Sequence, residues 1–218
     1  MLREFLCYKL YEEVTPYAFR TRLANLEITE LRGKRTKSFN VKAILIEDID
    51  KTAKRFNAKA LNKVQLSVPL EDTTSLRFDF FEFMISNTDW SKYYQHNARI
   101  IFREGDYLPI PYDFDMSGLV DAPYSTVSQV NGQQLPIESV RERYYRGHCS
   151  SPALTDYIRN EFLSKKEKFI SRVDGMKDEL SNRDIADTKE YLDIFFNILK
   201  DDHSFKIEIS DRCRNLKN

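Results

Sequence analysis

The sequence has few cysteines, no long apolar run and no excess of either charge. Its three cysteines, Cys7, Cys149 and Cys213, form no CxxC pair, and an odd count does not indicate a disulfide framework. We therefore expect buried free thiols. No apolar stretch approaches the roughly 18 to 20 residues that a membrane span requires. Charged side chains interrupt the first segment, so we expect no secretory signal there, and the compartment stays open.

Composition places the chain among ordinary globular proteins. Its 218 residues are enough for one domain or two small lobes. Lys and Arg together number 34, and so do Asp and Glu, which makes the formal net charge zero. This balance argues against a general nucleic-acid partner. The 15 Phe and 12 Tyr residues can supply a substantial core.

Hydrophobic periodicity predicts a helix and then a β-hairpin at the start of the chain. Residues 2–14 carry apolar side chains near helical spacing, and Thr15-Pro16 ends that pattern. Residues 17–29 and 41–46 have the character of strands. A basic turn at 31–37 would join them, so the pair is expected to form a hairpin.

The rest of the chain is expected to be mainly helical. Residues 47–50 leave the hairpin and enter a helix that extends to residue 56, with Asp50 as its N-cap. The other expected elements are an irregular segment at 62–72, a buried central helix at 76–85, strands at 98–102 and 107–110, a loop at 117–132, and amphipathic helices at 154–173 and 185–199. This order predicts an α+β fold with a helical second half.

The most informative stretch is residues 83–118, FMISNTDWSKYYQHNARIIFREGDYLPIPYDFDMSG. Asp89 follows an apolar run, Asn97 precedes an apolar strand, and Asp113 and Asp115 close the segment. A hairpin of the two intervening strands would carry both ends to one edge of the fold. Hard oxygen ligands gathered in this way suit Mg²⁺ and a phosphate.

Each of these residues also has a plainer interpretation. Asp89 can orient a hydroxyl and accept its proton, or it can belong to a turn that ends a helix. His96 can bind a phosphate or hold a carboxylate. Asn97 can bind a metal, or it can cap the entry to a strand. Asp113 and Asp115 point the same way on an extended chain and repel each other unless a cation lies between them. The alternative is a pair of turn aspartates in water.

Two further groups are candidates for ligand contacts. Arg141 and Arg143 lie in an Arg-rich segment and can meet phosphate or an acidic substrate, or they can pair with neighbouring carboxylates. Glu47 stands at the end of a predicted strand, where it can line a nucleotide pocket or belong to an ordinary solvated turn.

Several pieces of the sequence resemble the CotH (spore-coat) kinase-like family, a branch of the protein-kinase-like fold, and uncharacterised bacterial proteins related to it. They are LREFLCYKLYEEVTPYAFRTRL, ILIEDID, ISNTDW, HN before a strand, PIPYDFDMSG and SVRERYYRGHC. The resemblance runs from residue 2 to about residue 169. It implies a kinase-like fold with a partial β N-lobe and hinge at 1–50 and a mainly helical C-lobe at 51–218.

The resemblance also implies roles for the acidic cluster. Asp89 would be the catalytic-loop aspartate. Asn97 and Asp113 would hold metal, with Asp115 in support. The cofactors would be ATP and Mg²⁺ or Mn²⁺, and the acceptor, by analogy, a Ser or Thr of a protein.

By the same resemblance, residues near the start of the chain would bind the nucleotide and form the regulatory helix. Glu47, Asp48 and Ile49 would match the hinge over the adenine. The helix at 2–14 would match the regulatory helix of the N-lobe, with Glu4 as the candidate for its ion-pairing glutamate.

The sequence departs from the family pattern in two ways. Kinases of this fold place the asparagine five residues after the aspartate, whereas Asp89 and Asn97 are eight apart. Nothing before Leu2 can supply a glycine-rich turn or a phosphate-anchoring lysine. Relatives carry a β-rich segment there, often with an export signal. The chain thus resembles a family member without its N-terminal part, through a late start, a fragmentary gene model or a genuine loss.

Two other functions stay open beside an active kinase. One is a metal-dependent phosphoesterase that uses Asp89, His96, Asp113 and Asp115. The other is a non-catalytic pseudokinase that keeps the fold as a binding module. The missing lysine favours this second alternative.

Overall fold

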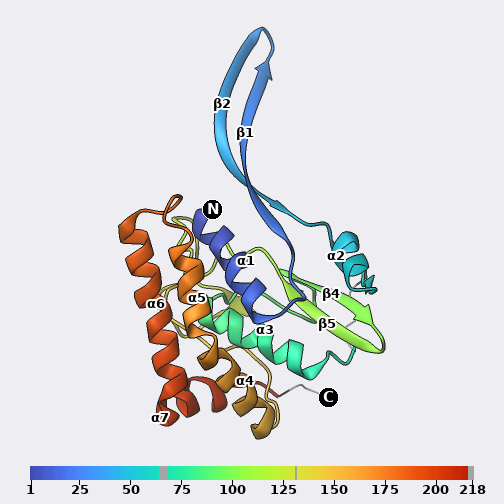
Figure 1. Ribbon diagram of the computed structural model, residues 1–218, viewed down its shortest axis with the longest axis vertical. Helices are drawn as coiled ribbons and strands as arrows, with labels where there is room; N and C mark the ends of the chain where they lie inside the picture. The colour runs from blue at the N-terminus through green and yellow to red at the C-terminus, as the bar shows by residue number, and fades with distance from the viewer. Residues whose placement is uncertain (64–67, 131, 216–218) are drawn as a thin grey trace.

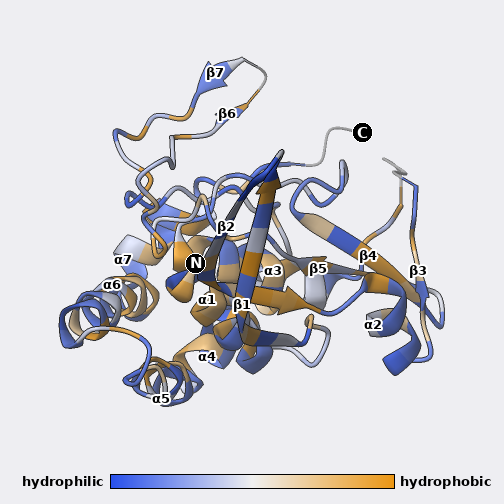
Figure 2. Cartoon of the chain, turned by 90° about the horizontal axis from the view of Figure 1, so that it is seen from above, coloured by the Kyte–Doolittle hydropathy of each residue, from blue (hydrophilic) through white to orange (hydrophobic). Residues whose placement is uncertain are grey.

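The computed structural model describes residues 1–63, 68–130 and 132–215. It shows a mixed α+β protein in which a long β-hairpin stands out from a largely helical body (Figure 1). The predicted α+β class with a helical second half is therefore confirmed. Seen from above, the helices of the second half gather on one side and the small three-stranded sheet lies on the other (Figure 2).

The first helix forms where periodicity predicts it. Helix α1 (Leu2–Val14) ends at Thr15, whose extended backbone precedes Pro16. Leu6 and Leu10 are fully buried and join the main hydrophobic core. Helix α1 packs against α3 (Asp72–Ile85) and α5 (Lys166–Asp174), so it shares its core with residues from the other end of the chain.

The predicted hairpin is confirmed, but its first strand begins and ends later than expected and its second strand begins six residues earlier. Strand β1 (Thr21–Arg32) pairs antiparallel with β2 (Arg35–Ile46) over its whole length. The prediction of a turn at 31–37 is wrong, because the ladder continues to the pair Arg32–Arg35. Only two residues form the turn, and Gly33 supplies the positive φ that such a tight connection needs.

The short helix after the hairpin is capped two residues earlier than predicted. Helix α2 (Ile49–Arg55) has Asp48 as its N-cap, and the Asp48 carboxylate accepts from the backbone N–H groups of Asp50 and Lys51. Asp50 is therefore the second helical residue, and its assignment as the cap is wrong. An aspartate at either position suits a helix N-terminus, which explains why the sequence pattern did not separate them.

The second predicted hairpin is also confirmed. Strand β4 (Ala98–Arg103) pairs antiparallel with β5 (Asp106–Pro111), and β3 (Lys59–Ala60) adds to the other edge of β4. The loop expected at 117–132 is irregular as far as it is described, apart from a two-residue strand. That strand, β6 (Gln129–Val130), pairs with β7 (Gln133–Gln134).

One predicted C-terminal helix is two helices. The amphipathic pattern at 154–173 belongs to α4 (Pro152–Ser164) and α5, which meet at Lys165. The Lys165 ammonium donates to the carbonyl of Val14 and to Glu161, so a contact distant in sequence fixes the break. The remaining elements are α6 (Asn182–Lys200), which confirms the helix predicted at 185–199, α7 (Asp202–Phe205) and a π-helical turn, η1 (Lys206–Ser210).

Helix α3 is the central helix that the sequence predicts. Its phenylalanines at 78, 80, 81 and 83 are at most 2% exposed. The same helix carries two buried carboxylates, Asp79 and Glu82. Glu82 is near enough to Asp89 for the two charges to influence each other. The part of the irregular segment predicted at 62–72 that falls on 64–67 lies outside the described residues. In the described ranges, no helix is long and apolar enough to cross a membrane.

The expectation of free thiols is wrong for two of the three cysteines. Cys149 and Cys213 form a disulfide across 64 residues of sequence. The backbone N–H of Arg214 donates to the carbonyl of Gly147, and the backbone N–H of Cys149 donates to the carbonyl of Arg214, which holds the two cysteine segments side by side. Cys7 is free and buried, as predicted. No local motif marks the bonded pair, because its two cysteines meet only through the fold.

Candidate functional site

The ends of the β4–β5 hairpin bring Asn97 and Asp113 to one edge of the sheet. Ala98 is paired with Pro111, and the next backbone N–H, that of Tyr112, donates to the carbonyl of Asn97 at 3.1 Å. Asn97 and Asp113 both have left-handed backbone, with φ of 49° and 61°. Such conformations are uncommon outside glycine, and Asn and Asp are among the residues that tolerate them.

Asp89 meets Asn97 in spite of the long spacing between them. The backbone N–H and carbonyl of Ser91 pair with those of His96, which closes the intervening residues into a compact loop. The Asn97 amide nitrogen then donates to the Asp89 carbonyl at 2.8 Å and to its Oδ2 at 3.2 Å. On the other side, Nε2 of His96 lies 2.9 Å from Oδ1 of Asp89. Both carboxylate oxygens are therefore held in place.

Aromatic packing positions the two aspartates that follow β5. The Phe114 ring is fully buried, 4.8 Å from that of Tyr8 and 5.5 Å from that of Phe81. The backbone N–H of Asp113 donates to the Tyr8 hydroxyl at 2.9 Å. The Tyr124 hydroxyl donates to Oδ2 of Asp115 at 3.1 Å. Helices α1 and α3 thus anchor the turn and leave both carboxylates half-buried.

The carboxylates of Asp89, Asp113 and Asp115 are close enough to influence one another's charge. Burial raises the pKa of Asp113, and the negative charges of Asp115 and Asp89 raise it further. Burial also raises the pKa of Glu4 on helix α1 to about 7, where Asp113 and Asp115 again contribute. The cluster therefore holds more negative charge than it can stabilise alone, and a cation would relieve the repulsion.

The protein side chains do not form a complete metal cage. Over residues 1–63, 68–130 and 132–215, no group of three or more His, Cys, Asp and Glu side chains is arranged to hold a metal ion. Mg²⁺ is commonly held by one or two carboxylates together with water and substrate phosphates. The mutual repulsion of Asp113 and Asp115 fits a cation of this kind, with Asn97 beside them as a further oxygen donor.

The structure shows supporting residues that the sequence interpretation missed. Arg146 donates to the carbonyls of Thr88 and Trp90, the two residues that flank Asp89. Oδ1 of Asn87 accepts from the backbone N–H of Asp89 at 3.0 Å. The Arg-rich segment was the available signal for Arg146, but the spacing of its arginines does not tell which of them faces this loop.

Arg141 and Arg143 have other contacts. The Arg141 guanidinium pairs with Asp187 on α6, at 3.0 Å, which is the alternative of a carboxylate partner. Arg143 is buried and donates to the carbonyls of Met84 and Tyr191. These contacts fasten α6 to the end of α3. Neither arginine contacts Asp89 or Asp113 in any hydrogen bond or ion pair of the described residues, so their predicted role in phosphate contact gains no support.

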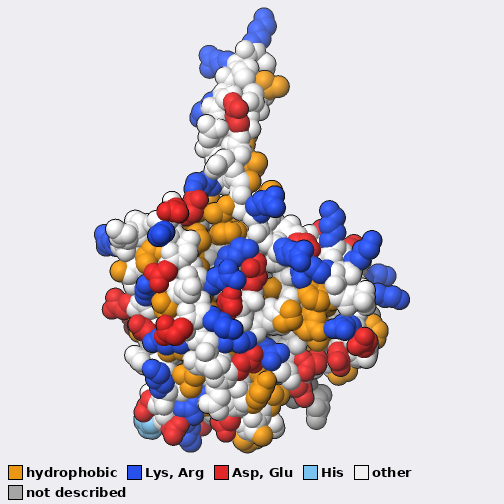
Figure 3. Space-filling view, viewed as in Figure 1, with side chains coloured by type: hydrophobic (Ala, Val, Ile, Leu, Met, Phe, Trp, Pro, Cys, Tyr) orange, Lys and Arg blue, Asp and Glu red, His pale blue; other side chains and the backbone are white. Residues whose placement is uncertain are grey.

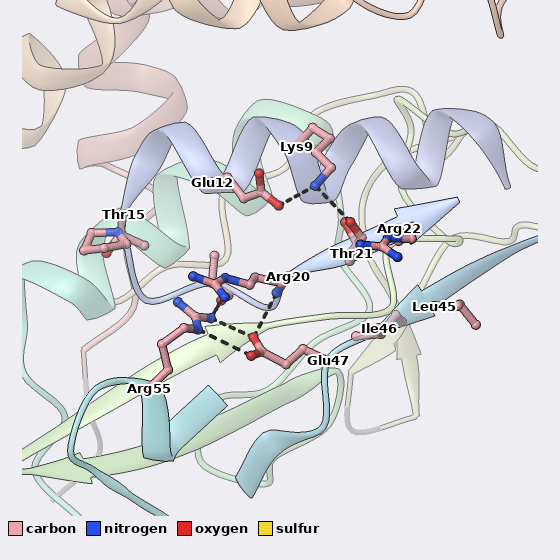
Figure 4. Close-up of a pocket in the computed structure, with 12 residues that line it drawn as sticks. Lys9, Glu12, Thr15, Arg20, Thr21, Arg22, Leu45, Ile46, Glu47 and Arg55 are labelled. Atoms are coloured by element: carbon pink, nitrogen blue, oxygen red, sulfur yellow. Dashed lines mark hydrogen bonds and ion pairs between the residues drawn. The ribbon is translucent and has the colours of Figure 1, made fainter. Parts of the chain in front are cut away.

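Of the predicted hinge residues, Glu47 borders a separate cavity of about 710 Å³, whereas Asp48 and Ile49 do not line it (Figure 4). Glu47 lines it, but its carboxylate pairs with Arg55 at 2.7 Å and accepts from Thr52 and from the backbone N–H of Arg20. Asp48 caps α2, and Ile49 begins that helix. The remaining wall comes from α1, the start of β1 and the end of β2. The Glu47 carboxylate and its backbone N–H, which donates to the carbonyl of Arg20 at 2.9 Å, are thus both engaged within the protein.

Comparison of the chain with protein-family models, with curated proteins and with solved structures finds no match. The interpretation of the site therefore depends on its own geometry.

Proposed function

We propose that the chain is a kinase-like phosphotransferase domain of the CotH type that binds ATP with Mg²⁺. The observation that carries the proposal is the meeting of Asp89, Asn97 and Asp113 at the ends of the β4–β5 hairpin. An aspartate, an asparagine and a second aspartate of this kind are what phosphoryl transfer requires for positioning and charge neutralisation.

The order of elements supports the same proposal. Helix α1 precedes a hairpin, a linker at 47–49, the central helix α3, the loop that carries Asp89, the β4–β5 hairpin and Asp113. This is the order that the resemblance implies for a partial N-lobe, a hinge and a C-lobe. Its boundary near residue 50 stays a prediction, as does the kinase-like character of the fold.

Asp89 is suited to accept a proton from an acceptor hydroxyl. His96 and Asn97 hold one carboxylate oxygen each, and Asn87 fixes the backbone beneath it. The His96 side chain is 58% exposed, so an acceptor can approach this side of the loop. Asn97, Asp113 and Asp115 would hold the metal, which when bound neutralises phosphate charge.

A non-catalytic binding module is the second candidate, and the surroundings of Glu4 favour it. The resemblance implies an ion pair for this residue, yet burial raises its pKa to about 7, and the neighbouring charges of Asp113 and Asp115 contribute. A glutamate paired with a lysine would have a lowered pKa instead. The regulatory ion pair of an active kinase is therefore not formed by Glu4 within the described residues.

Thermal unfolding of the chain with Mg²⁺ alone and with Mg²⁺ plus ATP tests the proposal. A ligand at a hundred times its dissociation constant should add about 2.7 kcal/mol to the free energy of unfolding. We expect such a shift for the wild type and its loss in Asp113→Ala. The control Asp106→Ala removes an exposed aspartate from the β4–β5 turn and should keep the shift.

Three results would argue against an ATP-dependent enzyme. Absence of any shift at millimolar ATP would exclude nucleotide binding by this chain and favour the binding module. An equal shift in Asp113→Ala would place the nucleotide elsewhere. Hydrolysis of a phosphodiester without ATP, lost in Asp89→Asn, would favour the phosphoesterase.

A further inference from the structure

The β1–β2 hairpin, called the arm below, extends into solvent as an isolated two-stranded ribbon (Figures 1 and 3). Its strands pair only with each other, and no third strand joins them in the described part of the chain. Several large apolar side chains of the arm are exposed: Leu26, Ile28 and Phe39 at 39% each, and Leu45 at 52%. A two-stranded ribbon without a partner is marginally stable in water.

The register divides the arm into two unlike faces. Because residues paired directly across an antiparallel ladder lie on the same side, the pairs Leu26–Val41 and Ile28–Phe39 share one face with Ala24–Ala43 and with Leu45. This is the apolar face. The opposite face is polar over the middle of the arm, at the pairs Asn25–Lys42, Glu27–Asn40 and Thr29–Ser38, and carries Leu31 near the tip and Leu23–Ile44 at the base. Such alternation is typical of a sheet with one face packed and one in water.

The arm is also strongly basic. Residues 21–46 contain six Lys and Arg side chains and two Glu side chains, whereas the whole chain has 34 of each sign. The arm therefore has an excess of four positive charges, and the rest of the chain has an equal excess of negative charges. The positive side chains gather at the tip, at Arg32, Lys34, Arg35 and Lys37 (Figure 3).

We propose that the apolar face binds the same face of a second copy of this chain, with the two arms antiparallel. The antiparallel arrangement places the two bodies at opposite ends of the paired arms, because each arm extends away from its own body (Figure 1). The antiparallel arrangement sets Leu26 and Val41 of one copy against Ile28 and Phe39 of the other. It also brings each basic tip toward the body of the other copy, which carries the compensating excess of four negative charges.

The size of the arm sets the expected strength. Twelve residues at about 3.3 Å each, on a ribbon about 10 Å wide, offer about 400 Å² per copy. A standard stable interface buries about 800 Å² per partner, so the contact between tip and body must supply part of the area. We therefore expect a reversible, salt-sensitive dimer.

Sedimentation velocity over a concentration series of the full chain tests this proposal. We expect a monomer–dimer equilibrium in the wild type. Ile28→Lys places a charge on the apolar face and should raise the dissociation constant by about ten-fold or more. Thr29→Lys adds the same charge one residue away on the polar face and should leave it within about two-fold. Phe39→Lys should repeat the effect of Ile28→Lys.

Thermal unfolding of each variant shows whether the body is still folded, since all three positions are exposed on the arm. A monomer at every concentration would overturn the proposal and leave the apolar face to a different polypeptide. An equal effect of Ile28→Lys and Thr29→Lys would also overturn it, because dimerisation would then not use the apolar face.

Discussion

The Lys92 ammonium lies 2.6 Å from Oδ1 of Asp79, and the two side chains are 0% and 2% exposed. Lys92 belongs to the loop that follows Asp89, whereas Asp79 lies on α3. The same ammonium donates to the carbonyl and the hydroxyl of Ser75. A buried charge thus fastens the candidate catalytic loop to the central helix.

Removal of Lys92 should therefore be costly. Lys92→Met leaves the Asp79 carboxylate buried without its partner, which should lower the free energy of unfolding by about 3–5 kcal/mol. Urea denaturation measures the loss. The double variant Lys92→Met/Asp79→Leu removes both charges and should recover most of it. If the double variant is as unstable as the single one, packing rather than charge explains the loss.

Reduction of the Cys149–Cys213 disulfide should destabilise the C-terminal part of the fold. The bond closes a loop of 64 residues that includes α4, α5 and α6. Loss of a native disulfide commonly lowers the free energy of unfolding by about 2–5 kcal/mol. Thermal unfolding with and without dithiothreitol should show this decrease. The variant Cys149→Ser/Cys213→Ser should start from the lower value and not respond to the reductant.

Local sequence patterns predict an element correctly where its structure depends mainly on its own residues. Helix α3 is apolar on nearly all sides, and the turn between β4 and β5 separates two short apolar strands, so both were predicted from the sequence. The meeting of Asn97 and Asp113 follows from that hairpin. The sequence also identified Asp89, because it follows the end of a buried helix.

The wrong predictions concern features that depend on contacts outside the local sequence pattern. The break at Lys165 depends on a hydrogen bond to Val14, and helical periodicity does not register such a contact. The charged segment at 31–37 resembles a turn, yet Glu30 and Lys37 face each other across the ladder and extend it. Arg146 donates to backbone carbonyls in the loop around Asp89. Since every residue has such a carbonyl, the sequence does not show which ones Arg146 contacts.

His148 should make stability fall under acid conditions. Burial lowers its pKa to about 3, and the positive charges of Lys92, Arg214 and Arg146 contribute. In the unfolded chain the pKa returns to about 6.5, so the unfolded state binds the proton first as pH falls. The stability that neutral His148 contributes is therefore complete above about pH 6.5 and is lost as pH falls toward about 3.

His148→Gln isolates this contribution. The difference in free energy of unfolding between wild type and variant should shrink between pH 7 and pH 4 in urea titrations, a range set by these two pKa values. His203→Gln, which changes an exposed histidine on α7, should show no comparable trend. A constant difference for His148→Gln would mean that the imidazole takes up its proton as readily in the folded protein as in the unfolded chain.

Glu4 should produce the opposite trend and link it to metal binding. Its pKa is raised from 4.5 to about 7 in the folded protein. Between these values the folded state keeps a proton that the unfolded state has released, so the stability present below about pH 4.5 is lost as pH rises through about 7. Glu4→Gln should remove this loss, whereas Glu27→Gln on the arm should not.

A cation near Asp113 and Asp115 would lower the pKa of Glu4, so Mg²⁺ should stabilise the wild type more at about pH 8 than at about pH 6. The thermal shift caused by Mg²⁺, measured at both pH values, should lose most of its pH dependence in Glu4→Gln. An unchanged dependence would show that Glu4 does not sense the metal.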